Sequence, residues 1–313
     1  MSTRIISRRE SAYRTSFPIE ELEVESPGEG RAKVIRKGLD WDRLERTARL
    51  AKPRFVHDPR REPYVYERLL PFGPPGPPRL LAPPPDACLR MDDKRAEGAG
   101  GGLWLEWVEG RPLAEVGERG VWEAAAGWLG RFHAAFEAAH ADRDMPADAP
   151  LIEHDADFHR FWLARARSFA VSGSDRGSAL EWLDARHEQV LEALSRMDRT
   201  LLHGEFYAAN VLVAEGEGAP RVAPVDWELA GPGPGALDLA ALVCGWPPAD
   251  RDAMRRAYGV GRGRELPARD LDLARLQIAI QWLGWAPPEW TPPPGQRRDW
   301  AAEAVEVAEE LEL

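Results

Sequence analysis

The side chains that could do chemistry together are concentrated in one stretch of the sequence. Glu205 is followed five positions later by Asn210, and Asp226 comes sixteen positions after that, at the end of a short apolar run. Carboxylate and carboxamide oxygens suit Mg²⁺, a hard cation that binds few protein groups and keeps several waters. Phosphoryl transfer from a nucleotide needs magnesium on the phosphates, an oriented acceptor hydroxyl and neutralised charge. Asn210 and Asp226 could hold the metal, and Glu205 could accept or orient the hydroxyl proton.

The chain around these residues is predicted to form a loop followed by a β-hairpin. The β-prone runs 211–213 and 222–226 are separated by the turn-rich residues 215–220, a pattern typical of a hairpin. The two candidate metal ligands would then lie at the start of the first strand and at the end of the second.

Apolar residues at helical spacing predict that most of the other C-terminal residues are helical. The first apolar face comprises Trp122, Ala125, Leu129, Phe132 and Phe136. These residues alternate steps of three and four, which places them on one side of a helix. Further helices are predicted at residues 158–169, 183–197, 273–283 and 300–313. Their apolar faces are expected to form the core.

The N-terminal part is predicted to mix strands with short helices. Residues 34–37 and 103–108 are β-prone, and residues 40–52 and 60–70 have helix-like spacing. Residues 71–85 are rich in proline, which favours a stiff internal connector over a ligand for a proline-binding domain.

Strands in the first third and helices around a later hairpin predict a two-lobed α+β protein. A turn at residues 109–112 marks the expected boundary. Residues 1–108 would form a small β-rich N-terminal lobe, and residues 109–313 a larger helical C-terminal lobe that contains the hairpin.

Composition narrows the classes of function. The 313 residues are 44 % hydrophobic and carry a net charge of −11, which argues against nonspecific nucleic-acid binding. The first residues do not read as a secretory signal, and no apolar run is long enough to cross a membrane. Cys88 and Cys244 are far apart and lack metal-ligand spacing, so reduced thiols are favoured over a disulfide. A cytoplasmic protein is expected; the sequence does not indicate its oligomeric state.

The segment from His203 to Asn210 resembles the catalytic loop of the aminoglycoside phosphotransferase and choline kinase superfamily, which has a protein-kinase-like fold. That loop has the form His-Gly-Asp, four residues, then Asn, and a following strand ends in a metal-binding Asp, here Asp226. Residues 235–240 resemble the Asp-Leu-Ala helix start that follows in this family. The resemblance covers roughly residues 15–285.

The resemblance implies roles for residues of the N-terminal lobe. Lys37 is similar to the lysine that contacts nucleotide phosphates, and Glu62 to the helix glutamate that pairs with it; a surface charge pair is the alternative. Residues 103–110 resemble the hinge strand, whose backbone at Glu106 and Val108 would meet a purine base. The implied cofactors are Mg²⁺ and ATP or GTP.

Other roles concern the loop and the acceptor. The resemblance implies that His203 supports the loop through hydrogen bonds. Asp238 is also expected to support the loop, and to cap the helix that it begins. Tyr207 is expected to pack the loop or to line the acceptor pocket. Glu228 could reach a second magnesium, contact the acceptor or lie in a solvated turn. No transition-metal site is expected from the histidine and cysteine spacing.

Three positions depart from the pattern of the family. Glu205 replaces the usual Asp, and its extra methylene moves the carboxylate by about 1.5 Å, the rise of one helical residue. Residues 27–30 form only a short glycine turn in place of a glycine-rich phosphate loop. Trp227 and Glu228 follow Asp226 where a protein kinase has Phe-Gly, which suggests a fixed segment.

The sequence therefore predicts a kinase that transfers the γ-phosphate of a nucleotide to a hydroxyl of a small molecule. The acceptor pocket is expected near residues 155–169 and 282–290, and aromatic residues there would suit an amine-bearing or polyhydroxylated acceptor. The alternative is a catalytically impaired pseudokinase that binds a nucleotide or serves as a scaffold. A protein kinase is less favoured because residues 211–245 lack Ser and Thr.

Overall fold

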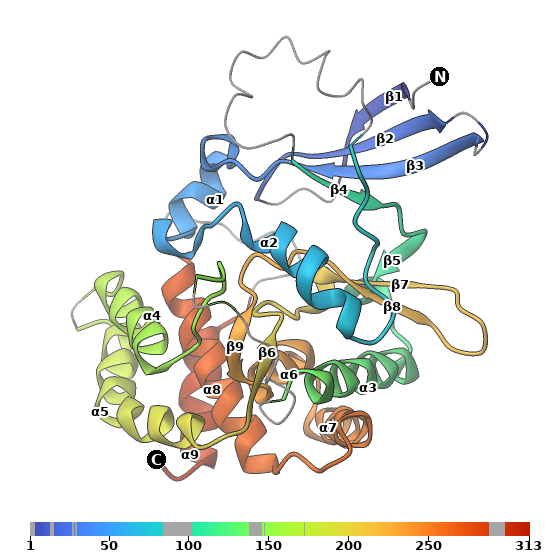
Figure 1. Cartoon of the computed structure of the whole chain (residues 1–313). Helices are drawn as coiled ribbons and strands as arrows, with labels where there is room; N and C mark the ends of the chain where they lie inside the picture. Colours follow the sequence, from blue (N-terminus) through green and yellow to red (C-terminus); the bar gives the residue numbers. More distant parts are fainter. Residues whose placement is uncertain are drawn as a thin grey trace.

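The computed structural model describes residues 4–12, 16–26, 28, 30–83, 102–137, 146, 148–171, 173–287 and 298–313. A sheet that carries the N-terminus lies at one end of the molecule and the larger helices lie at the other (Figure 1). The strands are β1 Arg4–Glu10, β2 Ile19–Ser26, β3 Gly30–Lys37, β4 Leu103–Glu106, β5 Gly110–Pro112, β6 Arg199–Leu202, β7 Val211–Ala214, β8 Arg221–Pro224 and β9 Gly231–Pro234. The α-helices are α1 Arg46–Ala51, α2 Arg61–Tyr64, α3 Arg119–Ala135, α4 Ala156–Ser168, α5 Asp175–Ser195, α6 Ala236–Val243, α7 Pro248–Arg262, α8 Ala268–Trp285 and α9 Trp300–Glu310.

The first sheet is antiparallel, with strand order β1-β2-β3-β4. Its register places Lys37 opposite Ile19 and Gly30 opposite Ser26. Gly30 therefore lies at the far end of β3 from Lys37, about 23 Å along the strand. The glycine turn at its end cannot cover phosphates beside Lys37. The chain that precedes Ile19 is the segment at the lysine end.

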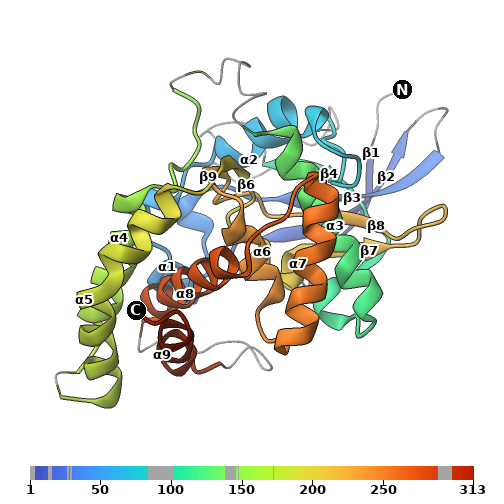
Figure 2. The same ribbon diagram turned by 90° about the horizontal axis from the view of Figure 1, so that it is seen from below.

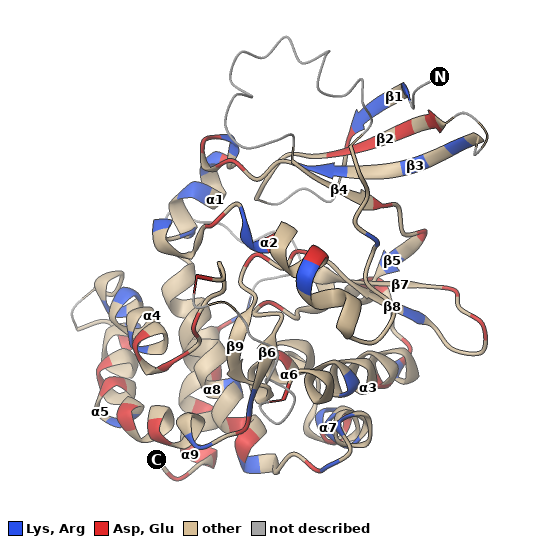
Figure 3. Cartoon of the chain, viewed as in Figure 1, with Lys and Arg blue, Asp and Glu red and all other residues tan. Residues whose placement is uncertain are grey.

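Charged side chains on this sheet are paired across neighbouring strands. Acidic residues gather on β2 and basic residues on β1 and β3 (Figure 3). Arg4 pairs with Glu25, and Arg36 with Glu20, each in an ion pair whose side-chain atoms approach within 2.6–2.7 Å. Opposite charges on adjacent strands stabilise the pairing and its register.

The proline-rich segment is an internal connector, as predicted, as far as residue 83; residues 84–85 lie outside the described residues. Leu80 forms a bridge with Leu105 of β4. The Trp128 Nε1–H of α3 donates to Pro75 O at 2.8 Å. The connector is thus tied to both the first sheet and the helical part.

The hairpin predicted before and after residues 215–220 is confirmed as β7 and β8, although Asp226 lies beyond the end of β8. The turn predicted at residues 109–112 is wrong in part, because Gly110–Pro112 is strand β5 and pairs with β7. The sequence did not predict strands β1, β2, β5, β6 and β9. β9 has the sequence Gly-Pro-Gly-Pro and pairs with β6, and both residue types are depleted in strands.

Helices make up most of the remaining structure. The predicted α3, α4, α5, α8 and α9 are confirmed, and α7 is an additional helix. The helix predicted at residues 40–52 is wrong in its first half: Leu44 and Glu45 are extended, and α1 begins at Arg46. Residues 61–72 are continuously helical, as predicted, with a π-helical stretch at Val65–Leu69.

Helices α4 and α5 lie to one side of α8, and α3 and α7 to the other (Figure 2). The α3 and α7 backbones approach closely because glycine lines their contact. A Cβ built on Gly130 would lie 2.2 Å from Tyr258 O. Among the described residues, no helix is both long and apolar enough to cross a bilayer.

Buried histidines of the helical part include His154, His159 and His187. His154 Nε2–H donates to Leu229 O at 2.8 Å, and His187 Nε2 contacts Gln277 Oε1 at 2.9 Å. Burial lowers the pKa of each imidazole. These residues are neutral parts of the core, and His154 also supports the chain next to Glu228.

Acidification is expected to lower the free energy of unfolding through His154. Burial lowers the pKa of His154 from 6.5 to about 4, so the unfolded chain takes up a proton that the folded state resists. The stabilising contribution is complete above pH 6.5 and is lost as the pH falls through the window from 6.5 to about 4. The loss at pH 5 should be about 2 kcal/mol, measurable by chemical denaturation at pH 7 and pH 5.

His154→Gln keeps an amide donor for Leu229 O and should lose less stability between these pH values than the wild type. Gln189→Ala, an exposed change on α5, should keep the wild-type pH dependence. Equal pH dependence in H154Q and the wild type would contradict the role of His154.

Candidate active site

The loop from His203 to Asn210 joins β6 to β7, and a buried carboxylate fixes its first residues. Asp238 accepts hydrogen bonds from the His203 N–H at 2.6 Å and the Gly204 N–H at 2.9 Å. Gly204 has a φ of 84°, and a Cβ there would lie 2.4 Å from Leu229 O. Only glycine fits this position without a shift of the neighbouring chain.

Asp238 is itself held by a relay from α3 and α7. His133 Nε2 lies 3.2 Å from Asp238 Oδ2, and His133 Nδ1 lies 2.8 Å from the Tyr258 hydroxyl. Burial opposes ionisation of Asp238, but His133 and the loop N–H groups outweigh it and lower its pKa. The expected cap is wrong: in α6, all of which is described, no side chain caps the N-terminus. Asp238 binds the loop instead.

His203 connects the loop to the segment that carries Asp226. Its Nε2–H donates to Val225 O at 2.9 Å, and its Nδ1 accepts from the Glu205 N–H at 3.3 Å. Burial lowers the pKa of His203, which favours the neutral ring that this pair of bonds requires. Both ring nitrogens are occupied, so the geometry favours support of the loop over general-base chemistry.

Asn210 and Asp226 are brought to the same place by the ends of the hairpin. Asn210 Nδ2–H donates to Glu205 O at 3.0 Å, which leaves the amide oxygen as its free end. The Val225 N–H donates to Asn210 O at 2.9 Å. Asp226 has a φ of 69°, a left-handed conformation that is uncommon outside glycine.

Lys37 joins Asp226 and Glu62 across the two parts of the molecule. Its Nζ lies 2.5 Å from Asp226 Oδ1 and 2.7 Å from Glu62 Oε2. Burial alone would lower the pKa of Lys37, but Asp226, Glu62 and Glu228 outweigh it and hold that pKa well above its ordinary value. The pair expected on the surface as the alternative is therefore buried, and it lies beside the candidate metal ligands.

The start of α2 also holds the backbone of residues 227–228. The Trp227 N–H donates to Glu62 Oε1 at 3.0 Å. Arg61 Nη1–H donates to Glu228 O at 2.5 Å and to Val56 O at 2.6 Å. Burial raises the pKa of Glu62 to about 7, with Lys37 acting against it. These bonds fix the segment after Asp226.

Glu228 lies in this site and pairs with Lys52, a residue that the motifs did not indicate. Lys52 Nζ forms a short contact with Glu228 Oε2, and the Lys52 side chain is 1 % exposed. Lys52 follows α1 as its C-terminal cap. A lysine after a charged helix looks like a surface residue in sequence, so no local signal could have identified it.

The site carries an excess of negative charge that a divalent cation could compensate. Four carboxylates, from Glu62, Glu205, Asp226 and Glu228, face the ammonium groups of Lys37 and Lys52 and the guanidinium group of Arg61, so full ionisation leaves an excess of one negative charge. Burial, followed by Glu228 and Asp226, raises the pKa of Glu205 well above its ordinary value. A cation bound at the site would reduce this repulsion between the carboxylates and favour the ionised form of Glu205.

The candidate ligands also suit magnesium better than a metal ion whose ligands all come from protein side chains. Among the described residues, no three His, Cys, Asp or Glu side chains form a metal-binding group. Magnesium is commonly held by one or two carboxylates together with substrate phosphates and water. Asp226 with the Asn210 amide oxygen fits that description.

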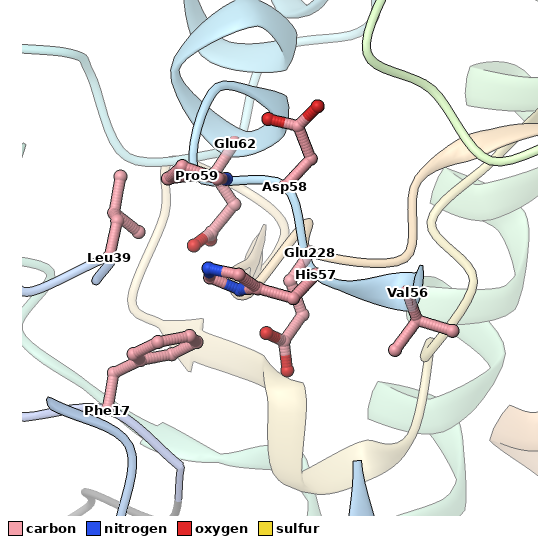
Figure 4. Close-up of a pocket in the computed structure, with 8 residues that line it drawn as sticks. All are labelled: Phe17, Leu39, Val56, His57, Asp58, Pro59, Glu62 and Glu228. Atoms are coloured by element: carbon pink, nitrogen blue, oxygen red, sulfur yellow. The ribbon is translucent and has the colours of Figure 1, made fainter. Parts of the chain in front are cut away.

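A small pocket opens beside the acidic residues. Its cavity volume is about 10 Å³, enough for about one water molecule, and it is lined by Phe17, Leu39, Val56, His57, Asp58, Pro59, Glu62 and Glu228. Figure 4 shows the Glu62 and Glu228 side chains entering it together with the Phe17 and His57 rings. The site is therefore accessible next to its charged groups.

Glu106 and Val108, expected to meet the base, lie at the junction of the two parts. The Glu106 N–H already donates to Arg79 O at 2.9 Å, and Val108 O accepts from the Gly110 N–H at 3.0 Å. The Glu106 carboxylate pairs with Arg221 of β8 at 3.0 Å. Base contacts at these residues stay a prediction and would use their other backbone groups.

Tyr207 belongs to an aromatic group on the helical side of the loop. Its ring lies 5.3 Å from Trp282 of α8, and Trp282 stacks on Trp300 of α9 at 5.5 Å. All three are only partly buried. Trp282 falls within the predicted acceptor region, whereas Trp290 lies outside the described residues.

The sequence matches the model of the Phosphotransferase enzyme family over residues 45–277. The chain belongs to this family, as the resemblance of the catalytic loop predicted. No curated protein is similar to it in sequence.

Solved structures share the fold. The choline kinase LicA from Streptococcus pneumoniae is similar with a TM-score of 0.61 and 12 % identity, over 99 % of this chain and 94 % of that one. A microcompartment-associated aminopropanol kinase has a TM-score of 0.59 and 16 % identity, over 97 % and 89 %. The GDP complex of wild-type aminoglycoside 2′-phosphotransferase-IIIa has a TM-score of 0.56 and 13 % sequence identity, over 99 % of this chain and 93 % of that one. The fold is the predicted two-lobed, protein-kinase-like α+β fold.

Asp238→Asn is expected to loosen the loop. Its amide oxygen can accept one loop N–H, but its NH₂ group would face the other, which costs about 1–3 kcal/mol for a buried unsatisfied donor. Chemical denaturation should show that loss, and hydrogen exchange should accelerate at His203 and Gly204. Asp157→Asn, whose side chain is 87 % exposed, should change neither quantity. Unaltered exchange in D238N would refute the support of the loop by Asp238.

Proposed function

We propose that this protein is a magnesium-dependent kinase that transfers the γ-phosphate of ATP or GTP to a hydroxyl of a small molecule. The observation that carries the proposal is the meeting of Lys37 and Glu62 with Asp226, next to Glu205 and Asn210. Residues 1–108 would hold the nucleotide, and residues 109–313 would carry the loop and the acceptor pocket.

Each residue has a defined task in this proposal. Asn210 and Asp226 hold the metal, which supplies charge neutralisation on the phosphates when bound. Lys37, oriented by Glu62, binds the phosphates. Glu205 orients the acceptor hydroxyl and takes its proton, and a raised pKa suits a base of this kind. Rate enhancement then comes from positioning and electrostatics.

An acceptor that bears an amine fits the site best. The Tyr207, Trp282 and Trp300 rings lie next to the loop that carries Glu205, and aromatic faces attract organic cations. Excess negative charge near Glu205 and Glu228 adds to that attraction. The similar structures named above include a choline kinase and an aminopropanol kinase.

The pseudokinase alternative is less favoured. A chain that had lost activity would be free to lose its metal ligands, yet Lys37, Glu62, Asn210 and Asp226 are all present in a connected arrangement. Among the catalytic-loop residues, Glu205 differs from the pattern of the family, and there the carboxylate is retained on a longer side chain.

Phosphate transfer should be detected with MgATP or MgGTP and a set of amino alcohols and aminoglycosides, and Asp226→Asn should abolish it. The substitution removes the charged metal ligand and one partner of Lys37. Nucleoside diphosphate release and the mass of the phosphorylated acceptor provide the measurement, with the exposed change Gln189→Ala on α5 as a control. Nucleotide binding without transfer to any acceptor would favour the pseudokinase, and full activity in D226N would exclude the metal assignment.

Glu205→Asp should lower kcat about a hundredfold, the cost of a misplacement of about 1 Å at a reacting centre. Backbone bonds at both the N–H and the carbonyl of residue 205 fix the main chain, so side-chain length alone decides where the carboxylate lies. Steady-state kinetics at saturating nucleotide and acceptor measure the change. A higher kcat would show that Glu205 is a handicap rather than an adjusted base.

A further inference from the structure

Lys52 is a second buried ammonium in the site, with no role in the motif of the family. Its side chain is 1 % exposed, and its Nζ lies 4.9 Å from the centre of the Phe17 ring. A buried lysine is costly unless a carboxylate and other favourable contacts compensate it. Glu228 and the Phe17 ring supply that compensation, so the position of the ammonium is well defined.

The segment that carries Lys52 is anchored to the acceptor side of the molecule. Arg165 of α4 donates to Ala51 O at 3.0 Å and to Gly284 O of α8 at 2.8 Å. The Phe55 ring packs edge-on against Phe161 of α4 at 4.6 Å. Lys52 lies between these anchors, so the helical part fixes it from outside the first sheet.

The two lysines divide the acidic residues between them. Lys37 pairs with Glu62 and Asp226. Lys52 pairs with Glu228, which lies two positions after Asp226 in the chain. Lys52 acts against the rise in the pKa of Glu205 more strongly than Lys37 does, and it also helps to lower the pKa of Asp226. Lys52 is thus paired to the residue two positions after Asp226 and interacts electrostatically with both Asp226 and Glu205.

We propose that Lys52 binds the γ-phosphate of the donor nucleotide and stabilises the phosphoryl group during its transfer, rather than serving only as the counter-ion of Glu228. This inference rests on the proposed kinase function. In the step, the bond from the γ-phosphorus to the β–γ bridging oxygen breaks and a bond to the acceptor oxygen forms. The acceptor proton goes to Glu205, and the products are a nucleoside diphosphate and a phosphomonoester. Lys52 keeps its proton throughout.

The test compares the affinity for a nucleoside triphosphate with that for the diphosphate. Lys52→Met should weaken MgATP or MgGTP binding about tenfold to a hundredfold, the value of a hydrogen bond to a charged group, and leave the diphosphate affinity unchanged. Calorimetric titration without acceptor measures both constants. Arg196→Met, which removes a 72 % exposed cation at the end of α5, should change neither constant.

A second comparison tests whether Lys52 serves only as the counter-ion of Glu228. It can still be made if K52M does not fold. Glu228→Gln is compared with the double variant Glu228→Gln, Lys52→Met. If Lys52 only compensates Glu228, the double variant should bind the triphosphate as E228Q does. A phosphate contact instead predicts a further loss that is specific to the triphosphate.

Kinetics complete the test. K52M should lower kcat about a hundredfold to a thousandfold, as loss of one charge-stabilising donor does, with the KM for the acceptor unchanged. Equal losses for triphosphate and diphosphate, or an unchanged ratio in both comparisons, would overturn the role of Lys52. Failure of the wild type to bind any nucleotide would instead refute the proposed function itself.

Discussion

The arrangement of the site depends on one acidic segment, residues 226–228, which is held in a largely desolvated environment. Its carboxylates face Lys37 and Lys52, and its backbone N–H and carbonyl groups are bonded by Glu62 and Arg61. All four partners come from chain that precedes residue 63, so these bonds also join the two parts of the molecule. These bonds favour a fixed position for residues 226–228. The corresponding Asp-Phe-Gly segment of a protein kinase can change position, and the presence of Trp227 and Glu228 in place of Phe-Gly suggested this difference from sequence.

The same constraint explains the strained backbone at Asp226. A non-glycine residue at a φ of 69° costs about 1–3 kcal/mol and persists where the surroundings over-determine it. Here the Lys37 ion pair holds its side chain, and His203 holds the preceding carbonyl at Val225. On the other side, Tyr258 and His133 hold Asp238, which fixes the loop. Two rigid supports thus bring Glu205 and Asp226 together.

Sequence reasoning predicted the parts of this arrangement that depend on local pattern. The helical faces, the hairpin and the loop were recognised because periodicity and motif spacing are local properties. Strand β9 was missed because its Gly-Pro-Gly-Pro sequence opposes strand formation, and pairing with β6 overrides that preference. Lys52 was missed because its place in the site depends on a contact with Glu228, 176 positions away.

The charge balance ties the metal and both lysines into one unit. A nucleoside triphosphate brings further negative charge into a site whose four carboxyl groups already outnumber its three cationic groups, Lys37, Lys52 and Arg61. Binding then requires the metal, Lys37 and Lys52 together, because removal of any one leaves charge uncompensated in a region of low dielectric. Losses from removing two of them should therefore be smaller than the sum of the single losses, as for residues that act on the same charge. The longer side chain of Glu205 belongs to the same balance, since its carboxylate interacts with both lysines.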